Sequence, residues 1–251
     1  MKKFLIYSLS VGMMALSLLS CNDGNDEHTD KRVTYYATLE LNGAEYMVVD
    51  KGSTYEEPGF SAEMQGEDAS DKVVVNSNVD TSTSGVYSVA YSIVNADGFS
   101  VEKVRTVVVL DPNDPVEGIY QTSSDAYRDY NGTLTNYGGP FEVLIINNGD
   151  GSYYFEDLMA GWYCQRAGYG ADYNMYSNVS INEDGSLELL DSYVPGWGDA
   201  ADALEGTYDS ATGKFTYVLD YAGVIQFHVT LEKEGLDLDE DESEEEVTNE
   251  E

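Results

Sequence analysis

Apolar residues alternate with small or polar residues along most of the chain. From Tyr87 to Ile93 every second side chain is apolar, which predicts a β-strand with one buried and one solvent-facing side. The mostly β-branched run 104–109 suits a neighbouring strand. Further short runs of this kind occur at 33–41, 46–49 and 73–75. Together they predict a small β-sandwich over residues 33–110.

The second half repeats short strand-like runs between turns rich in Asn, Asp and Gly. These turns fall at 147–151, 182–185 and 209–214, and such turns join antiparallel strands. In the last run the apolar residues alternate from Ile225 to Leu231, which places His228 on the polar side. Residues 116–234 are therefore predicted to form an antiparallel β meander, as a small barrel or a sandwich, with the barrel favoured. The predicted fold class is all-β.

Two prolines separate these halves, at positions 112 and 115. Proline lacks a backbone donor and restricts the residue before it to extended conformations. Residues 111–115 are therefore predicted to end the preceding strand and to form a short, fairly stiff linker.

Three separated segments of the first half carry a resemblance to a known family. They are 52–62, with an acidic residue, Pro and Gly in a turn, then 79–81 with 85–91, and the strand 105–109. In this order they resemble the bacterial surface immunoglobulin-like domain family. The resemblance implies an immunoglobulin-like β-sandwich that acts as a spacer or adhesion module and has no catalytic residues.

The second half carries a fainter resemblance, in the short segments 118–120, 206–208 and 229–231. They are similar to the uncharacterised all-β C-terminal domain that accompanies the same module in Bacteroides-type surface lipoproteins. Members of that group often belong to glycan-acquisition systems, so the resemblance implies a setting rather than a mechanism.

The first 20 residues have the pattern of a lipoprotein signal peptide. Two lysines precede an apolar stretch at 4–19 that is too short and interrupted for a membrane-spanning helix, and Cys21 follows. Cleavage before Cys21 and lipidation of that cysteine would anchor the protein. The acidic segment 21–32 is predicted to be a flexible tether, and it resembles a surface-export signal of Bacteroides-type lipoproteins. We expect an outer-membrane protein facing the cell exterior, with a periplasm-facing orientation as the alternative.

The formal net charge of −35 narrows the partners that the protein can bind. A strongly acidic protein repels nucleic acids and anionic membrane surfaces, so no nucleic-acid partner is expected. Much of the charge lies in the tail 235–251, which is predicted to be disordered. With Cys21 lipidated, Cys164 has no partner for a disulfide and is expected to be a small buried residue.

Catalytic chemistry has little support in the sequence. Of the two histidines, one lies in the tether and His228 is expected on the surface, and no nucleophile, zinc or phosphate-loop motif occurs. Carboxylates that could form a glycosidase pair, Glu142, Glu156, Asp157 and Asp191, are unremarkable in so acidic a chain. We expect no enzyme, no metal site and no cofactor. Ca²⁺ remains an alternative because the loops are rich in Asp and Asn, although no complete calcium-loop pattern is present.

Glycan binding is the sharper hypothesis, because sugars pack their C–H faces on aromatic rings and pair their hydroxyls with polar groups. Glycine-rich segments of the second half combine both kinds of residue. The candidate platform comprises Trp162, Tyr163, Arg166, Tyr169, Tyr173, Trp197 and Asp199. Trp and Tyr are also ordinary core residues, so burial of Trp162 or Trp197 is the competing interpretation.

These observations predict a non-catalytic lipoprotein that serves as a cell-surface glycan-binding accessory of a polysaccharide uptake system. The expected partners are the membrane through the lipid anchor, a polysaccharide or oligosaccharide, and outer-membrane uptake proteins. The alternative is a structural or adhesion lipoprotein that binds another protein through an apolar patch.

Overall fold

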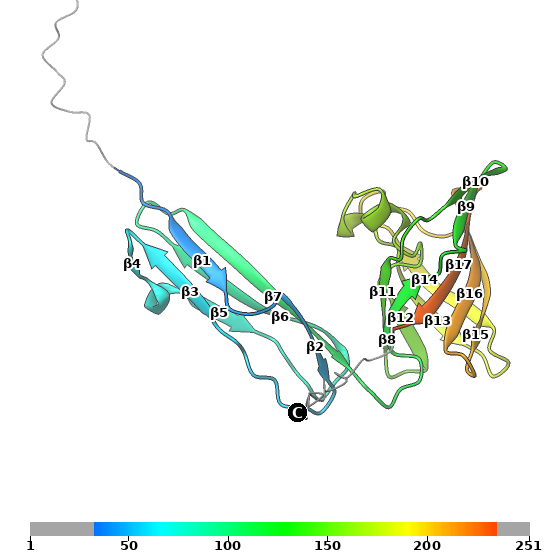
Figure 1. The fold of residues 1–251 in the computed structure, drawn as a ribbon, viewed down its shortest axis with the longest axis horizontal. Coiled ribbons are helices and arrows are strands. Elements are labelled where there is room, and N and C mark those ends of the chain that lie inside the picture. Colours follow the sequence, from blue (N-terminus) through cyan, green and yellow to red (C-terminus); the bar gives the residue numbers. More distant parts are fainter. Residues whose placement is uncertain (1–32, 235–251) are drawn as a thin grey trace, which may run out of the picture.

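The computed structural model describes residues 33–234 as two β domains joined by a short linker (Figure 1). The all-β fold class predicted from the sequence is confirmed. The predicted signal peptide, Cys21, the tether and the acidic tail lie outside the described residues. Within residues 33–234, no helix has the length and apolar character needed to cross a membrane.

The N-terminal domain is a sandwich of two sheets. One sheet has the order β1 (Ala37–Leu41), β3 (Phe60–Met64), β4 (Glu67–Asp68), and the other β2 (Tyr46–Asp50), β7 (Ser100–Leu110), β6 (Gly85–Val94), β5 (Val74–Ser77); η1 is Ser70–Lys72. Strand β2 runs parallel to β7, and the other pairs are antiparallel. The predicted alternation in β6 is confirmed, because Val89, Tyr91 and Ile93 are buried.

A charged residue, Arg105, also lies in this core. It sits on β7 and is fully buried. Its Nε donates to Glu57 Oε1 at 2.9 Å, and its other nitrogens donate to the carbonyl oxygens of Asn42 (2.7 Å), Gly59 (3.1 Å) and Ala44. The guanidinium therefore ties the connection after β1 to the turn before β3.

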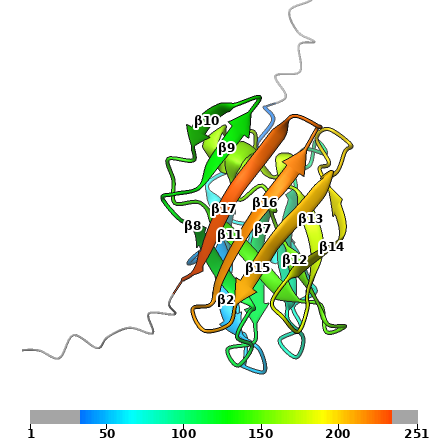
Figure 2. The same cartoon turned by 90° about the vertical axis from the view of Figure 1, so that its right-hand side faces the viewer.

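The C-terminal domain is a sheet curled into a half-barrel (Figure 2). Its elements are β8 (Gly118–Thr122), β9 (Tyr127–Tyr130), β10 (Thr133–Asn136), β11 (Glu142–Asn147), β12 (Ser152–Phe155), η2 (Trp162–Arg166), η3 (Ala171–Tyr173), β13 (Tyr176–Ile181), β14 (Leu187–Tyr193), β15 (Ala203–Asp209), β16 (Lys214–Tyr221) and β17 (Ile225–Lys233). Strands β11–β14 form one meander and β15–β17 another. An isolated bridge between Ser186 and Thr207 joins the two ends of the sheet.

The strand order departs from the predicted simple meander at β9 and β10. Strand β17 pairs with β8 through Leu231–Lys233 and with β9 through Ile225–His228, while β16 occupies its other edge. The long last strand therefore offers one edge to two shorter strands. The last strand therefore lies next to the first strand of the domain, and the β9–β10 hairpin pairs with β17 rather than with β8.

Aromatic side chains dominate the core of the half-barrel. Tyr137 and Tyr217 are buried, and their hydroxyls donate to the carbonyl oxygens of Met159 (2.9 Å) and Leu158 (3.0 Å). Burial raises the pKa of both tyrosines well above the ordinary value. Many tyrosines of this domain are therefore core residues whose polar tips are satisfied internally.

The linker is tied to both domains. Glu117 is buried and accepts hydrogen bonds from the backbone N–H groups of Asp111 (2.6 Å) and Asn147 (3.1 Å). An apolar cluster completes the joint and consists of Val108, Leu110, Leu144 and Ile146 with Ile119 and Tyr154 packed against it. These contacts hold β7 against the β8–β11–β12 part of the half-barrel.

Candidate functional site

The helical turns and the β9–β10 hairpin lie at the end of the C-terminal domain away from the linker (Figure 1). A group of aromatic rings comes from these helical turns and from the loop that follows β14. We call Tyr163, Tyr169, Tyr173 and Trp197 the aromatic cluster. Trp197 meets Tyr163 and Tyr173 edge-on, with ring centroids 4.6 and 4.9 Å apart. Tyr169 packs edge-on against Tyr173 at 5.2 Å. Trp197 is 41% exposed and Tyr169 56% exposed, so the cluster presents ring surface to solvent.

A single turn of π-helix decides which rings face inward. Arg166 N–H donates to the Gly161 carbonyl and Ala167 N–H to the Trp162 carbonyl, each five residues back. Short π-helical turns occur frequently at functional sites. Here the turn directs Trp162 into the core and leaves the next residue, Tyr163, half-buried at the surface.

Trp162 is therefore not a platform, and the prediction for this residue is wrong. Only 3% of it is exposed, and its ring packs against Tyr137 and Phe227. The guanidinium carbons of Arg128 and Arg166 lie 4.6 and 4.2 Å from its ring centroid. The core interpretation of this tryptophan holds, because its ring is covered by these cations and by neighbouring rings.

Arg166 serves this packing as well. Its Nε donates to the Tyr137 carbonyl oxygen at 2.9 Å, which fixes the side chain beside Trp162. The residue is still solvent-exposed, so part of the side chain borders the surface beside the aromatic cluster.

The loop that carries Trp197 is held by its own backbone. Val194 N–H donates to the Asp199 carbonyl at 2.8 Å, and Gly198 N–H donates back to the Val194 carbonyl at 2.8 Å. Gly196 N–H reaches across to the Asp172 carbonyl at 2.6 Å. A Cβ atom at Gly196 would lie 2.7 Å from the Tyr173 ring, so only glycine lets that ring approach.

Asp199 connects this loop to the β16–β17 hairpin. The Tyr221 hydroxyl donates to Asp199 Oδ2 at 2.7 Å, and burial together with this carboxylate raises the pKa of Tyr221. Asp199 itself is exposed. Burial raises the pKa of Tyr163, and the charge of Asp199 adds to this rise, so the carboxylate lies close to the aromatic cluster.

Asp157 organises the base of the site, a role that the sequence did not suggest. This carboxylate is 1% exposed and accepts hydrogen bonds from the N–H groups of Met159 (3.0 Å), Gly161 (2.7 Å) and Met175 (2.9 Å). The thiol of Cys164, which is half-buried, donates to Asp157 Oδ2 at 3.2 Å. Because these donors bracket residues 161–175, Asp157 fixes both ends of the segment that carries three of the cluster's rings.

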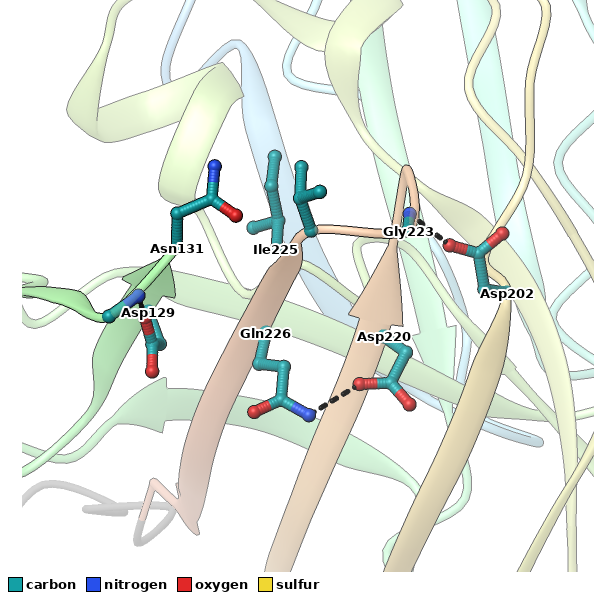
Figure 3. Close-up of a pocket in the computed structure, with 9 residues that line it drawn as sticks. Asp129, Asn131, Asp202, Asp220, Gly223, Ile225 and Gln226 are labelled. Carbon is teal, nitrogen blue, oxygen red and sulfur yellow. Dashed lines mark hydrogen bonds between the residues drawn. The ribbon is translucent and has the colours of Figure 1, made fainter.

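A polar groove of about 520 Å³ borders the same end of the half-barrel (Figure 3). Three carboxylates from different elements line it: Asp129 on β9, Asp202 before β15 and Asp220 on β16. The Gly223 N–H donates to Asp202 Oδ2 at 2.7 Å, and Gln226 Nε2 donates to Asp220 Oδ1 at 2.8 Å. Sequence reasoning missed this groove because its residues meet only through strand pairing.

The remaining candidates for chemistry are spread over the domain. His228 stacks on Tyr127 with ring centroids 4.3 Å apart, and Asp191 accepts two hydrogen bonds from Asn178. Burial and the neighbouring Asp157 raise the pKa of Glu156. Between residues 33 and 234, no set of three or more His, Cys, Asp or Glu side chains is arranged to hold a metal ion.

Comparisons with known proteins assign both domains. The family described as bacterial surface protein, Ig-like domain matches residues 39–109, and a C-terminal domain family matches residues 110–233. The crystal structure of the lipoprotein BT2262 from Bacteroides thetaiotaomicron is 37% identical, covers 79% of this chain and 100% of that chain, and has a TM-score of 0.68. The chain belongs to the family of this Bacteroides lipoprotein. A search of the curated proteins found no match.

More distant structures add nothing to this family assignment. Two structures of Clostridium perfringens ZmpB are both 14% identical with a TM-score of 0.26: CBM51-2 in complex with GlcNAc and INT domains, and the M60 catalytic domain with CBM51-1 and CBM51-2. They cover 45% and 48% of this chain and 30% and 15% of their own chains. Similarity this low carries no functional argument.

Proposed function

We propose that this family member is a non-catalytic lipoprotein that binds carbohydrate through the aromatic cluster. The observation that carries the proposal is Trp197, an exposed ring that stands on a backbone-braced loop between Tyr163 and Tyr173. Exposing 41% of a tryptophan costs solvation free energy, and a binding role gives a reason for keeping the ring there.

The geometry supports a sugar ligand in two ways. Aromatic rings that are fixed before binding lose little conformational entropy when they accept the C–H face of a sugar. Polar groups close to apolar surface give orientation and specificity, and Asp199 is such a group. The loop hydrogen bonds and the contacts of Gly196 supply the rigidity that such a platform needs.

The proposed setting is the outer membrane, with the protein lipidated at Cys21 and facing the cell exterior. The family relationship to a lipoprotein supports the anchor, and the sequence pattern around Cys21 supports its position. Its partners in this proposal are a polysaccharide or oligosaccharide and the outer-membrane proteins that take it up.

Titration of the soluble chain from residue 22 with a panel of polysaccharides tests the proposal. Tryptophan emission suits this measurement because Trp197 is exposed and Trp162 is buried. We expect a saturable change with at least one glycan. Because Trp197→Ala removes the exposed reporter, calorimetry measures that variant, and we expect its affinity to fall about tenfold or more.

The matched control is Tyr193→Ala, an exposed aromatic residue on β14 outside the cluster. It should bind as the parent does. If every glycan leaves the emission unchanged and calorimetry records no heat of binding, carbohydrate binding is refuted. Equal losses in both variants would show that the glycan-binding surface is not confined to the aromatic cluster.

A further inference from the structure

We infer that the groove beside the aromatic cluster holds further units of the same glycan, and that its carboxylates restrict that glycan to chains of neutral or amino-bearing sugars. This inference rests on the proposed function. It adds the class of ligand and its extent, since one ring platform would hold only one or two sugar units.

The aromatic cluster and the groove share two borders. The loop 195–202 carries Trp197 at the cluster and ends at Asp202 in the groove. The β16–β17 hairpin carries Tyr221, whose ring centroid lies 6.3 Å from that of Trp197, and two residues later Gly223 lines the groove. Tyr221 faces the buried side of β16, whereas Asp220 and Gln226 line the groove on the opposite side of the sheet. A glycan chain that leaves the Trp197 ring would therefore reach the groove by passing around the tip of this hairpin.

The groove is equipped to bind hydroxyl groups. Asp129, Asp202 and Asp220 each have one carboxylate oxygen engaged by a donor of the protein, the Gly132 N–H, the Gly223 N–H and the Gln226 amide. The second oxygen of each carboxylate can accept from a sugar hydroxyl or amine. In Figure 3 the side chains of Gln226 and Asp220 stand next to one another on the sheet face, with Asp129 on the neighbouring strand.

The charged side chains that line the groove are all acidic. Among the described residues that line the groove there is no lysine or arginine. The nearby cations Arg128 and Arg166 are held on the Trp162 ring, at 4.6 and 4.2 Å. An acidic sugar such as a uronate or a sulfated unit would meet uncompensated carboxylates, whereas a neutral or amine-bearing unit would not.

The test uses glucan, mannan and N-acetylglucosamine oligomers of two and six units, each in neutral form and with the C6 alcohols oxidised to carboxylates where the sugar allows. Calorimetry on the chain from residue 22 should show that the six-unit form of the recognised neutral sugar binds at least tenfold more tightly than its two-unit form. The triple variant Asp129→Asn/Asp202→Asn/Asp220→Asn should bind the oxidised six-unit form at least tenfold more tightly than the parent does. Asparagine keeps one acceptor oxygen for the N–H groups, and unchanged emission of buried Trp162 reports that the fold survives.

Two controls separate the possible failures. Gln226→Ala should weaken the six-unit form and leave the two-unit form unchanged, and Asp184→Asn, in the β13–β14 turn outside the groove, should change neither. Binding of the two-unit form with no gain from length, or equal affinity of the parent for neutral and oxidised chains, overturns this inference and leaves the proposed function standing. No binding of any oligomer overturns this inference, and it overturns the proposed function as well if the panel of polysaccharides also gives no binding.

Discussion

Each domain buries a charged side chain that binds backbone groups: the cation of Arg105 in the N-terminal domain and the anion of Asp157 in the C-terminal domain. Arg105 donates to carbonyl groups, whereas Asp157 accepts from N–H groups. Arg105 gathers backbone carbonyl groups from the segment around β1 and β3. Asp157 gathers backbone N–H groups from both ends of residues 161–175. Each charge therefore replaces regular strand pairing where the chain leaves the sheet.

The two sites differ in how the charge is compensated and in what the tied segment carries. Arg105 has a counter-ion in Glu57, at 2.9 Å. Among residues 33–234, no lysine or arginine forms a salt bridge with Asp157, which depends on N–H groups and a thiol. The loops tied by Arg105 bring the family motif together, whereas the segment tied by Asp157 exposes aromatic rings. A buried charge that binds several backbone groups indicates a loop with a fixed conformation. The side chains that the loop exposes then indicate its function.

Removing the cation should have the largest effect on stability. Arg105→Met leaves Glu57 without its counter-ion and several carbonyl groups without a donor, so we expect the N-terminal domain to lose about 3–5 kcal/mol of its free energy of unfolding. Urea unfolding followed by far-UV circular dichroism measures this loss. Both tryptophans lie in the C-terminal domain, so the fluorescence transition should stay close to that of the parent.

Lys103→Met on the same strand is the matched control, because Lys103 forms an exposed pair with Glu45 at 3.6 Å. It should cost less than about 1 kcal/mol. If the two variants were equally stable, the role assigned to Arg105 would be wrong.

Removing the anion should have the next largest effect. In Asp157→Asn the side-chain amide would oppose the Gly161 N–H, which leaves a buried donor unpaired, and we expect a loss of about 2–3 kcal/mol in the C-terminal domain. Tryptophan fluorescence during urea unfolding measures it. Asp172→Asn, an exposed position in the same segment, should leave the fluorescence midpoint unchanged; a midpoint for Asp157→Asn equal to this control's would contradict the assignment.

Strands could be predicted from the sequence where buried side chains recur at every second residue. The alternation along β6 predicted its buried side chains, because a strand turns every second residue to the same face. Arg105 lies on the buried side of β7, and its partner Glu57 belongs to another of the motifs that carried the family resemblance. The sequence placed both residues in motifs without linking them, because the link depends on packing between two sheets.

The candidate site could be predicted only in part. Trp162 and Tyr163 are neighbours in one glycine-rich segment, and a π-helical turn, which no periodic pattern signals, buries the first and leaves the second at the surface. Trp197 is exposed, as the hypothesis of a binding platform requires. Asp157 looked like one carboxylate among many, because Met175, one of its partners, lies 18 residues away.

A smaller effect is expected from a substitution that alters the packing of the aromatic cluster without removing a charge. Gly196→Ala would place a methyl group against the Tyr173 ring and displace it from Trp197, so affinity for the recognised glycan should fall about tenfold. Trp197 emission reports the displacement even without ligand. Gly198→Ala is the control, since its φ of +72° makes it strained but no atom lies within 4 Å of the added carbon. Gly198→Ala should lose stability and keep the parent's affinity for the glycan. If Gly196→Ala also kept the parent's affinity, Tyr173 would not position the Trp197 ring.

The smallest predicted effect is on the pH dependence of stability, and its sign differs between the domains. Burial raises the pKa of Asp157, and burial with the charge of Asp157 raises that of Glu156. The folded C-terminal domain therefore binds protons more readily than its unfolded chain, so these groups stabilise it as the pH falls from neutral towards about 4.

Other carboxylates of the described chain act in the opposite sense. Partial burial opposes ionisation of Glu57, yet the Tyr55 hydroxyl, the Gly59 amide and Arg105 hold its pKa below the ordinary value. Hydrogen bonds from Ser152, Ser186 and Thr212 likewise lower the pKa values of Asp150, Asp184 and Asp209 in turns of the C-terminal domain. Stability from these groups is present above their unfolded pKa values and is lost as the pH falls through the folded ones.

The fluorescence midpoint in urea should consequently rise as the pH falls from 7 towards about 4 and then decrease. The circular dichroism signal of the N-terminal domain should show no such rise, because Glu57 acts only in the lower range. Asp157→Asn should flatten the rise while leaving the decrease below pH 4, because its amide does not titrate. A fluorescence midpoint that falls steadily from pH 7 downward, or a rise that persists unchanged in Asp157→Asn, would contradict the assignment of a buried anion without a counter-ion beneath the aromatic cluster.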